Sequence, residues 1–99
     1  MKIAPKHLTA ESKAIWKRLT GVFNFGEDHL LLLKVSLEAY DRLQNARVEI
    51  DSDGPTYKTD SGYYRPHPAL QIEKEARSGF LQAWRMLNLD VDPPTIEDF

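Results

Sequence analysis

Residues 27–50 read EDHLLLLKVSLEAYDRLQNARVEI, and this stretch decides the fold. Its apolar residues recur every three or four positions, which is the period of an amphipathic α-helix. Glu27 and Asp28 suit the positively polarised start of such a helix. We therefore predict one long helix over 27–50, about 36 Å in length. Its main apolar stripe comprises Leu30, Leu33, Leu37, Tyr40 and Leu43.

The first half of this long helix is apolar on nearly every side. A helix of that kind has to be covered on several faces, and one short helix plus one other would not easily cover it. We therefore expect copies of the chain to pack together, with a compact three-helix monomer as the alternative. The periodicity does not divide the candidate residues between an oligomer interface and the core of one chain. Those candidates are Leu31, Leu32, Val35, Leu37, Phe80 and Trp84.

A shorter helix is predicted on each side of the long one. Residues 9–23 carry an apolar stripe through Trp16, and Thr9 is a suitable N-cap. Residues 68–88 form the third helix, with Pro68 in its first turn. Between the long helix and the third helix, residues 56–65 combine β-prone residues with a turn at Gly62. This combination indicates a hairpin or an ordered loop. The predicted fold class is mainly α, with two shorter helices and one long central helix in an oligomeric helical assembly.

Composition limits the kind of protein this can be. The 99 residues are expected to form a single domain, 1–99, which includes an extended basic segment at 1–8 and an acidic tail at 89–99. It has no cysteine, which excludes disulfides and cysteine metal sites and fits a reducing compartment. Its apolar runs fall far short of a membrane span or a signal peptide. We therefore expect a cytoplasmic protein with no membrane partner.

Charge is distributed unevenly along the chain. Residues 1–18 contain five bases and one acid, whereas 88–99 contain four acids and no base. Cations on one helix face can contact phosphates, which gives salt-dependent binding to nucleic acid. An ordinary solvated helix face is the alternative reading of the same residues. The candidate nucleic-acid residues are Lys2, Lys6, Lys13, Lys17 and Arg18.

The sequence shows no convincing catalytic or metal-binding pattern. His7, His29 and His67 fall in separate predicted elements without metal-ligand spacing. Residues 51–54, DSDG, faintly resemble the start of a calcium loop, but the glycine comes too early and the distal glutamate is missing. A helix-ending turn explains them better. We therefore expect no enzyme activity, no cofactor and no metal.

Three segments in order resemble a known family. They are LTAESKAIWKRL at 8–19, GYYRPHPAL at 62–70 and LNLD at 87–90, the last followed by prolines. Across residues 8–94 this order is similar to the small terminase subunits of tailed phages and prophages. The family-signature residues are Trp16, Gly62 and Pro68.

The resemblance implies a role in viral DNA packaging in the cytoplasm of a bacterial host. Small subunits of this kind form homo-oligomeric rings and recognise the packaging site on double-stranded DNA. They also regulate the large terminase subunit, which holds the ATPase and the nuclease. The alternative function is a small helical adaptor or regulator with no DNA role, which would differ in its size in solution.

Overall fold

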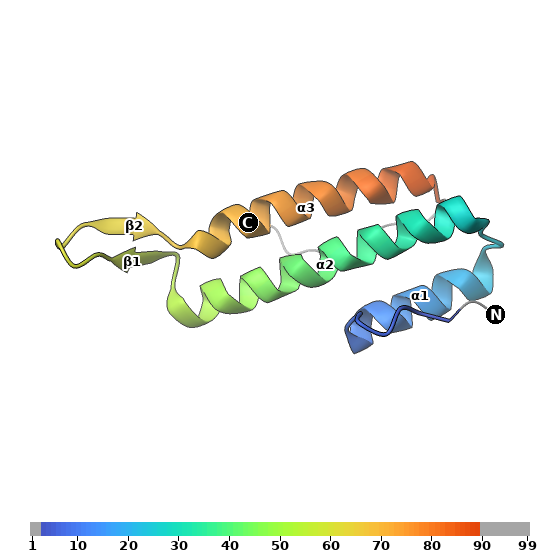
Figure 1. Cartoon of the computed structure of the whole chain (residues 1–99), viewed down its shortest axis with the longest axis horizontal. Coiled ribbons are helices and arrows are strands. Elements are labelled where there is room, and N and C mark those ends of the chain that lie inside the picture. The colour runs from blue at the N-terminus through green and yellow to red at the C-terminus, as the bar shows by residue number, and fades with distance from the viewer. Residues whose placement is uncertain (1–2, 90–99) are drawn as a thin grey trace.

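The computed structural model describes residues 3–89. In chain order they form α1 (Ala10–Val22), α2 (Glu27–Asp53), β1 (Thr56–Lys58), β2 (Tyr64–Pro66) and α3 (Pro68–Leu87) (Figure 1). This arrangement confirms the predicted mainly helical fold and resolves the segment between the second and third helices as a hairpin. Lys2 and, apart from Leu89, the predicted acidic tail lie outside the described residues.

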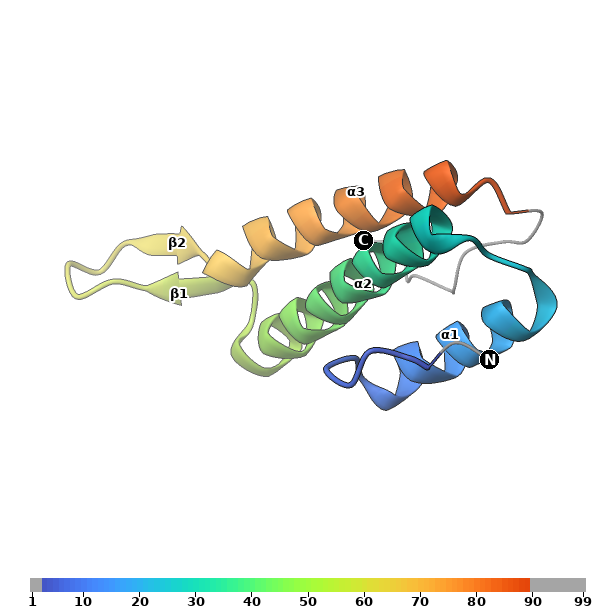
Figure 2. The same ribbon diagram turned by 45° about the vertical axis from the view of Figure 1, so that its right-hand side comes forward.

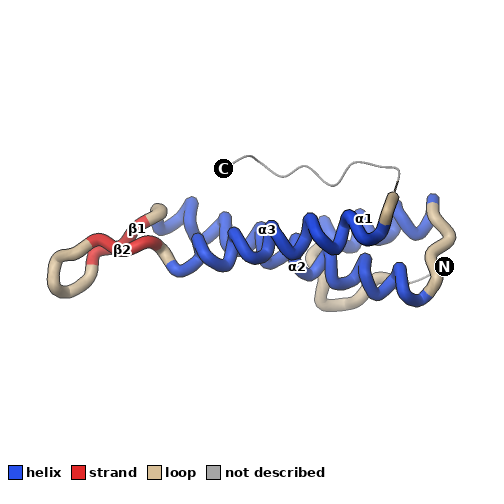
Figure 3. The backbone as a smooth tube through the Cα atoms, turned by 90° about the horizontal axis from the view of Figure 1, so that it is seen from above, coloured by secondary structure: helices blue, strands red, loops and turns tan. Residues whose placement is uncertain are grey.

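The molecule is elongated, because its two long helices form an antiparallel arm. Its extents are 56 × 23 × 20 Å. α2 lies in the middle, with α3 along one side and α1 against the N-terminal half of its other side (Figures 1 and 2). The hairpin continues beyond the arm at the end opposite the last turn of α3 (Figure 3). The two ends of the arm therefore present different elements.

Local sequence sets where each helix begins and ends. The Thr9 hydroxyl caps α1 by accepting a hydrogen bond from the Ser12 backbone N–H, at 3.2 Å. α3 begins with Pro68, and Asn88 ends it in the left-handed conformation, with φ of 53°. α2 continues three residues beyond the predicted end at Ile50. It stops at Asp53 because Gly54 has φ of +85°, a conformation that disfavours residues with a side chain.

The hydrophobic core lies where all three helices run side by side. α1 contributes Trp16 and Leu19, and Leu8 packs beneath it from the preceding segment. Phe80 is fully buried. The centroid of its ring lies 5.4 Å from the ring centroid of Tyr40 and 5.5 Å from that of Trp84. Such tilted pairs add about 0.5–1.5 kcal/mol beyond the area they bury. This cluster fixes α1 and α3 on opposite sides of α2.

The hairpin has a short antiparallel ladder and a tight turn. Thr56 pairs with Pro66, Tyr57 with Arg65, and Lys58 with Tyr64. Gly62 adopts φ of +89° in the turn, which explains why glycine suits this position. All the strand residues are exposed, so the hairpin extends into solvent.

Candidate nucleic-acid and subunit interfaces

A carboxylate on α2 holds the start of α1 in place. Asp41 accepts hydrogen bonds from the Thr9 backbone N–H at 3.0 Å, from the Thr9 hydroxyl at 2.7 Å and from the Ser12 hydroxyl. These donors belong to the first turn of α1, where backbone N–H groups have no partner within the helix. Asp41 therefore fixes both the position and the direction of α1 on α2.

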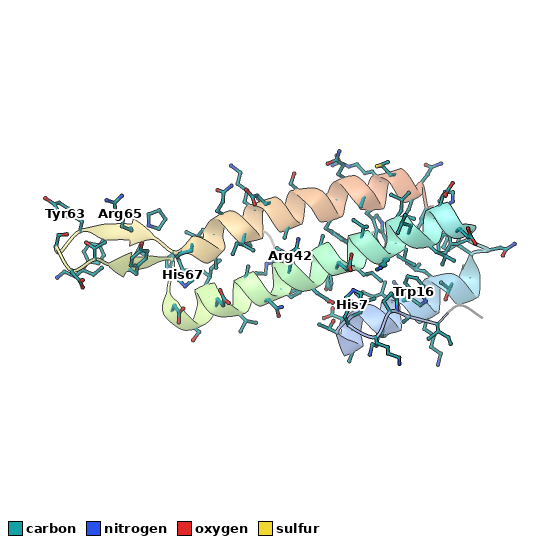
Figure 4. All side chains as sticks on the ribbon, viewed as in Figure 1. His7, Trp16, Arg42, Tyr63, Arg65 and His67 are labelled. Atoms are coloured by element: carbon teal, nitrogen blue, oxygen red, sulfur yellow. The ribbon has the colours of Figure 1, made fainter. Side chains whose placement is uncertain are left out.

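Two further polar contacts attach the N-terminal region to α2. The Tyr40 hydroxyl donates to Glu11 at 2.6 Å, and His7 Nε2 lies 2.6 Å from the Glu38 carboxylate (Figure 4). Burial, and then the hydrogen bond to the Glu11 carboxylate, raise the pKa of Tyr40 from 10.0 to about 12. The protonated tyrosine is thus the form that the fold favours.

The candidate nucleic-acid residues that the structure describes all lie on the surface. α1 turns its buried stripe, Ser12, Trp16 and Leu19, towards α2, so Lys13 and Lys17 lie one turn apart on its outward side. Lys6, Lys13, Lys17 and Arg18 are exposed, and they make no ion pair with another described residue. Arg18 is rotated about 100° around the helix axis from Lys17, so it faces a different direction from the two lysines. The structure therefore brings Lys13 and Lys17 together and leaves Arg18 to one side.

The structure separates the candidate interface residues into two groups. Leu37, Phe80 and Trp84 are buried in the core of the single chain. Leu31 and Val35 remain 61% and 47% exposed, and Leu32 is half-buried. The exposed residues lie on the sides of α2 that neither α1 nor α3 covers. They are apolar positions in the first half of α2 that one chain leaves at least partly open to water.

A groove runs beside Val35, between α2 and α3. Its volume is about 370 Å³, and Arg42, Glu38 and Glu75 add charges among its walls. Its apolar and small lining residues are Val35, Ala39, Ile72, Ala76 and Gly79. Ile72 and Gly79 were not among the interface candidates chosen from the sequence. Their spacing of seven residues is the available signal, since it places both on the same side of α3.

A histidine joins the base of the hairpin to the helices. His67 caps α3, because its Nδ1 accepts from the Ala69 backbone N–H at 2.9 Å. In a neutral ring the proton then lies on Nε2, which is 2.9 Å from the Asp53 carboxylate. An open, mainly apolar hollow of about 430 Å³ lies here, lined by Asp53, Tyr57, His67 and Pro68. Sequence reasoning did not identify this hollow.

The described residues contain no constellation suited to catalysis or metal binding. His67 contacts a carboxylate at the hairpin end of α2, His7 contacts one near the middle of α2, and His29 stacks on Phe25. Within residues 3–89 there is no group of three or more potential metal ligands. The DSD sequence at 51–53 forms the last turn of α2 rather than a loop. None of the described helices is both long and apolar enough to traverse a bilayer.

Comparison with known proteins shows which family the chain belongs to. The family model described as phage terminase, small subunit, matches residues 10–92. The chain belongs to the phage terminase small-subunit family. No curated protein and no solved structure gave a significant match. Membership of this family connects the chain to phage DNA packaging.

The family-signature residues occupy structurally demanding positions in this small-subunit fold. Trp16 is buried and points from α1 towards α2 (Figure 4). Gly62 supplies the positive φ of the hairpin turn, and Pro68 is the first residue of α3. All three lie within the matched range, and each position limits which residue types fit.

Proposed function

We propose that this chain is a self-associating, non-catalytic packaging subunit that contacts double-stranded DNA and acts on the large terminase subunit. The family match over residues 10–92 carries the proposal. The exposed cations of α1 and the uncovered apolar face of the arm support it, since they suit a polyanion and a protein partner respectively.

The proposed DNA contact is the outward side of α1. Lys13 and Lys17 lie one turn apart on that side, Arg18 follows Lys17 in the helix, and Lys6 is exposed in the segment before α1. Lysines on a helix surface neutralise phosphates without reading bases, so the contact would add affinity and little sequence discrimination. Asp41 positions this helix, because it holds the first turn of α1 on α2.

The proposed contact between copies is the groove face, which we define as Leu31, Val35, Ile72 and Gly79. Three of these four are exposed apolar residues, and Gly79 has open space where a side chain would lie. A helix from another copy can approach closely at such a position. Burying this face would remove apolar surface from water at about 25 cal/mol per Å².

Charge reversal on α1 tests the DNA contact. We expect Lys13→Glu with Lys17→Glu to weaken binding of a fluorescent duplex by about tenfold or more at low salt. Losing two phosphate contacts should also make the slope of log affinity against log salt concentration less steep, by about two. Fluorescence anisotropy across a salt series measures both quantities.

The matched control is Lys58→Glu with Lys74→Glu, since both residues are exposed and the charge change is equal. We expect the control to bind DNA nearly as well as the unmodified chain. Equal losses in both variants would mean that net charge alone governs binding, and unchanged binding in the α1 variant would contradict the proposed contact. A large subunit whose ATPase rate ignores the small subunit would contradict the regulatory part.

A further inference from the structure

The hairpin is the most exposed aromatic surface of the described chain. Tyr63 and Tyr64 are 70% and 72% exposed, and Tyr57 is 46% exposed. A two-stranded hairpin with neither face covered is only marginally stable in water. Exposed tyrosines together with arginine are also characteristic of protein interfaces. The hairpin therefore has the composition of a surface that another segment covers.

One face of the hairpin continues into the apolar hollow at its base. Tyr57 lines that hollow, and Arg65 pairs directly with Tyr57 across the two strands, so both side chains share a face. Tyr63 lies two residues from Arg65 on the same face. Arg65 makes no ion pair with another described residue (Figure 4). The surface thus offers aromatic rings beside an available guanidinium group.

We propose that this hollow binds the proline-containing acidic segment of a second copy of the chain, residues 90–99. That segment contains Pro93 and Pro94 together with four acids and no base. Consecutive prolines favour the polyproline II conformation, which docks on aromatic surfaces at little entropic cost. The prolines would lie over the Tyr57 and His67 rings. The carboxylates would meet Arg65, since Asp53 is already hydrogen-bonded to His67.

Chain length identifies the occupant as a second copy. α3 has 20 residues, so about 30 Å separate its last turn from the hollow at its first turn. Pro94 lies five residues after Leu89, and five residues span at most about 18 Å when fully extended. The prolines of one chain therefore cannot reach its own hollow, whereas those of a neighbour can.

Two other occupants fit the hairpin less well. A second hairpin added to the edge strands would meet Lys58 and Arg65, and charged side chains on edge strands oppose such pairing. DNA would find only two cations here, with Asp53 and Asp60 close by in the sequence. The acidic, proline-containing segment matches both the rings and the charge.

A peptide titration tests the hollow directly. The probe is a fluorescein-labelled peptide spanning residues 89–99. The receptor is the full chain carrying Pro93→Ser and Pro94→Ser, which weakens competition from its own segment. We expect saturable binding that Arg65→Glu weakens by about tenfold, as does Tyr57→Ser. Tyr57→Phe should retain binding, and so should Lys74→Glu, an exposed charge reversal on α3. Circular dichroism checks that each variant is folded.

Cross-linking tests whether the contact joins two copies. A photo-reactive residue at position 57 is placed in full chains, and unlabelled and 15N-labelled chains are mixed equally. We expect cross-links from position 57 to residues 89–99, with mixed-label pairs as frequent as same-label pairs. Cross-links confined to one chain would overturn the assignment to a second copy.

The inference rests on the self-association proposed above. The two experiments distinguish a failure of self-association from a failure of the hollow as a binding site. A chain that stays monomeric but binds the peptide through Arg65 keeps the hollow as a binding site and overturns self-association. An oligomer whose peptide affinity ignores Arg65→Glu and Tyr57→Ser overturns the inference and leaves the proposed function standing. Loss of DNA affinity in Arg65→Glu with unchanged peptide binding would assign the hairpin to nucleic acid instead.

Discussion

Individual residues in this protein combine structural and positioning roles. Three hydrogen bonds from the start of α1 converge on the Asp41 carboxylate. Tyr40 packs its ring on Phe80 and turns its hydroxyl to Glu11, so one side chain contacts α3 and α1 at once. The position of α1, and of the lysines it carries, therefore depends on a few polar atoms of α2.

The raised pKa of Tyr40 predicts an alkaline loss of stability. The tyrosine titrates near 10 in the unfolded chain and near 12 in the folded one, so its contribution is complete below pH 10. That contribution is lost as the pH rises from about 10 to about 12. We expect Tyr40→Phe to cost about 1 kcal/mol at neutral pH through the lost hydrogen bond. We also expect it to flatten the alkaline decline, as measured by urea unfolding across that range.

The control for the alkaline prediction is Tyr63→Phe. Tyr63 is exposed on the hairpin, so removing its hydroxyl should change neither the stability at neutral pH nor the alkaline slope. An equally steep decline in the Tyr40→Phe variant would show that other groups cause the alkaline unfolding.

At the scale of elements, the three helices differ in how firmly they are held. α2 and α3 pack along the whole arm, whereas α1 contacts only the N-terminal half of α2. Elements with fewer buried contacts open at a lower free-energy cost than the global unfolding of the chain. We therefore infer that α1 is the most readily released helix.

Removing Asp41 should release α1 selectively. We expect Asp41→Ala to lower stability by about 2–3 kcal/mol, because it removes a capping carboxylate and strands its donors. Hydrogen exchange should accelerate at the amides of α1 while those of α2 and α3 stay protected. Asp51→Ala, an exposed acid in the last turn of the same helix, should leave exchange in α1 unchanged. Uniform acceleration in all three helices would contradict a separable α1.

The sequence allowed the elements to be predicted better than their contacts. Apolar periodicity located all three helices, and Thr9 and Pro68 marked two of their starts, because these signals are local. The extra turn of α2 was missed because it depends on the backbone of Gly54. Periodicity could not separate Leu37 from Val35, because their burial depends on where α1 and α3 pack. The hollow at His67 likewise joins residues that are distant in sequence.

At the scale of the whole molecule, the uncovered face of the arm is the dominant feature. The chain leaves Leu31, Val35 and Ile72 partly in water along the arm, and it also leaves Val22, Val48 and Met86 exposed at other helix positions. Small domains commonly gain stability by packing copies together. The groove face is therefore the surface whose loss should change the size of the particle in solution.

Charges placed on the groove face should dissociate the assembly. We expect Leu31→Glu with Val35→Glu to lower the mass measured by light scattering towards that of a monomer. Helicity should persist, because both residues are exposed within one chain. Val22→Glu with Val48→Glu places the same charges on other exposed apolar sites and should preserve the mass. An unmodified chain that is monomeric at every concentration would contradict the proposal.

The elongated shape has a consequence for the direction of neighbouring arms. α1 lies near one end of the arm and the hairpin forms the other, so the α1 end and the hairpin end of every copy can be told apart. If the hairpin end of one copy binds the last residues of another copy, adjacent arms are either antiparallel or joined end to end. Opposed arms would display their lysine-bearing helices on both faces of a particle. Such a particle could hold two DNA segments at once, whereas arms aligned in one direction would hold DNA on a single side.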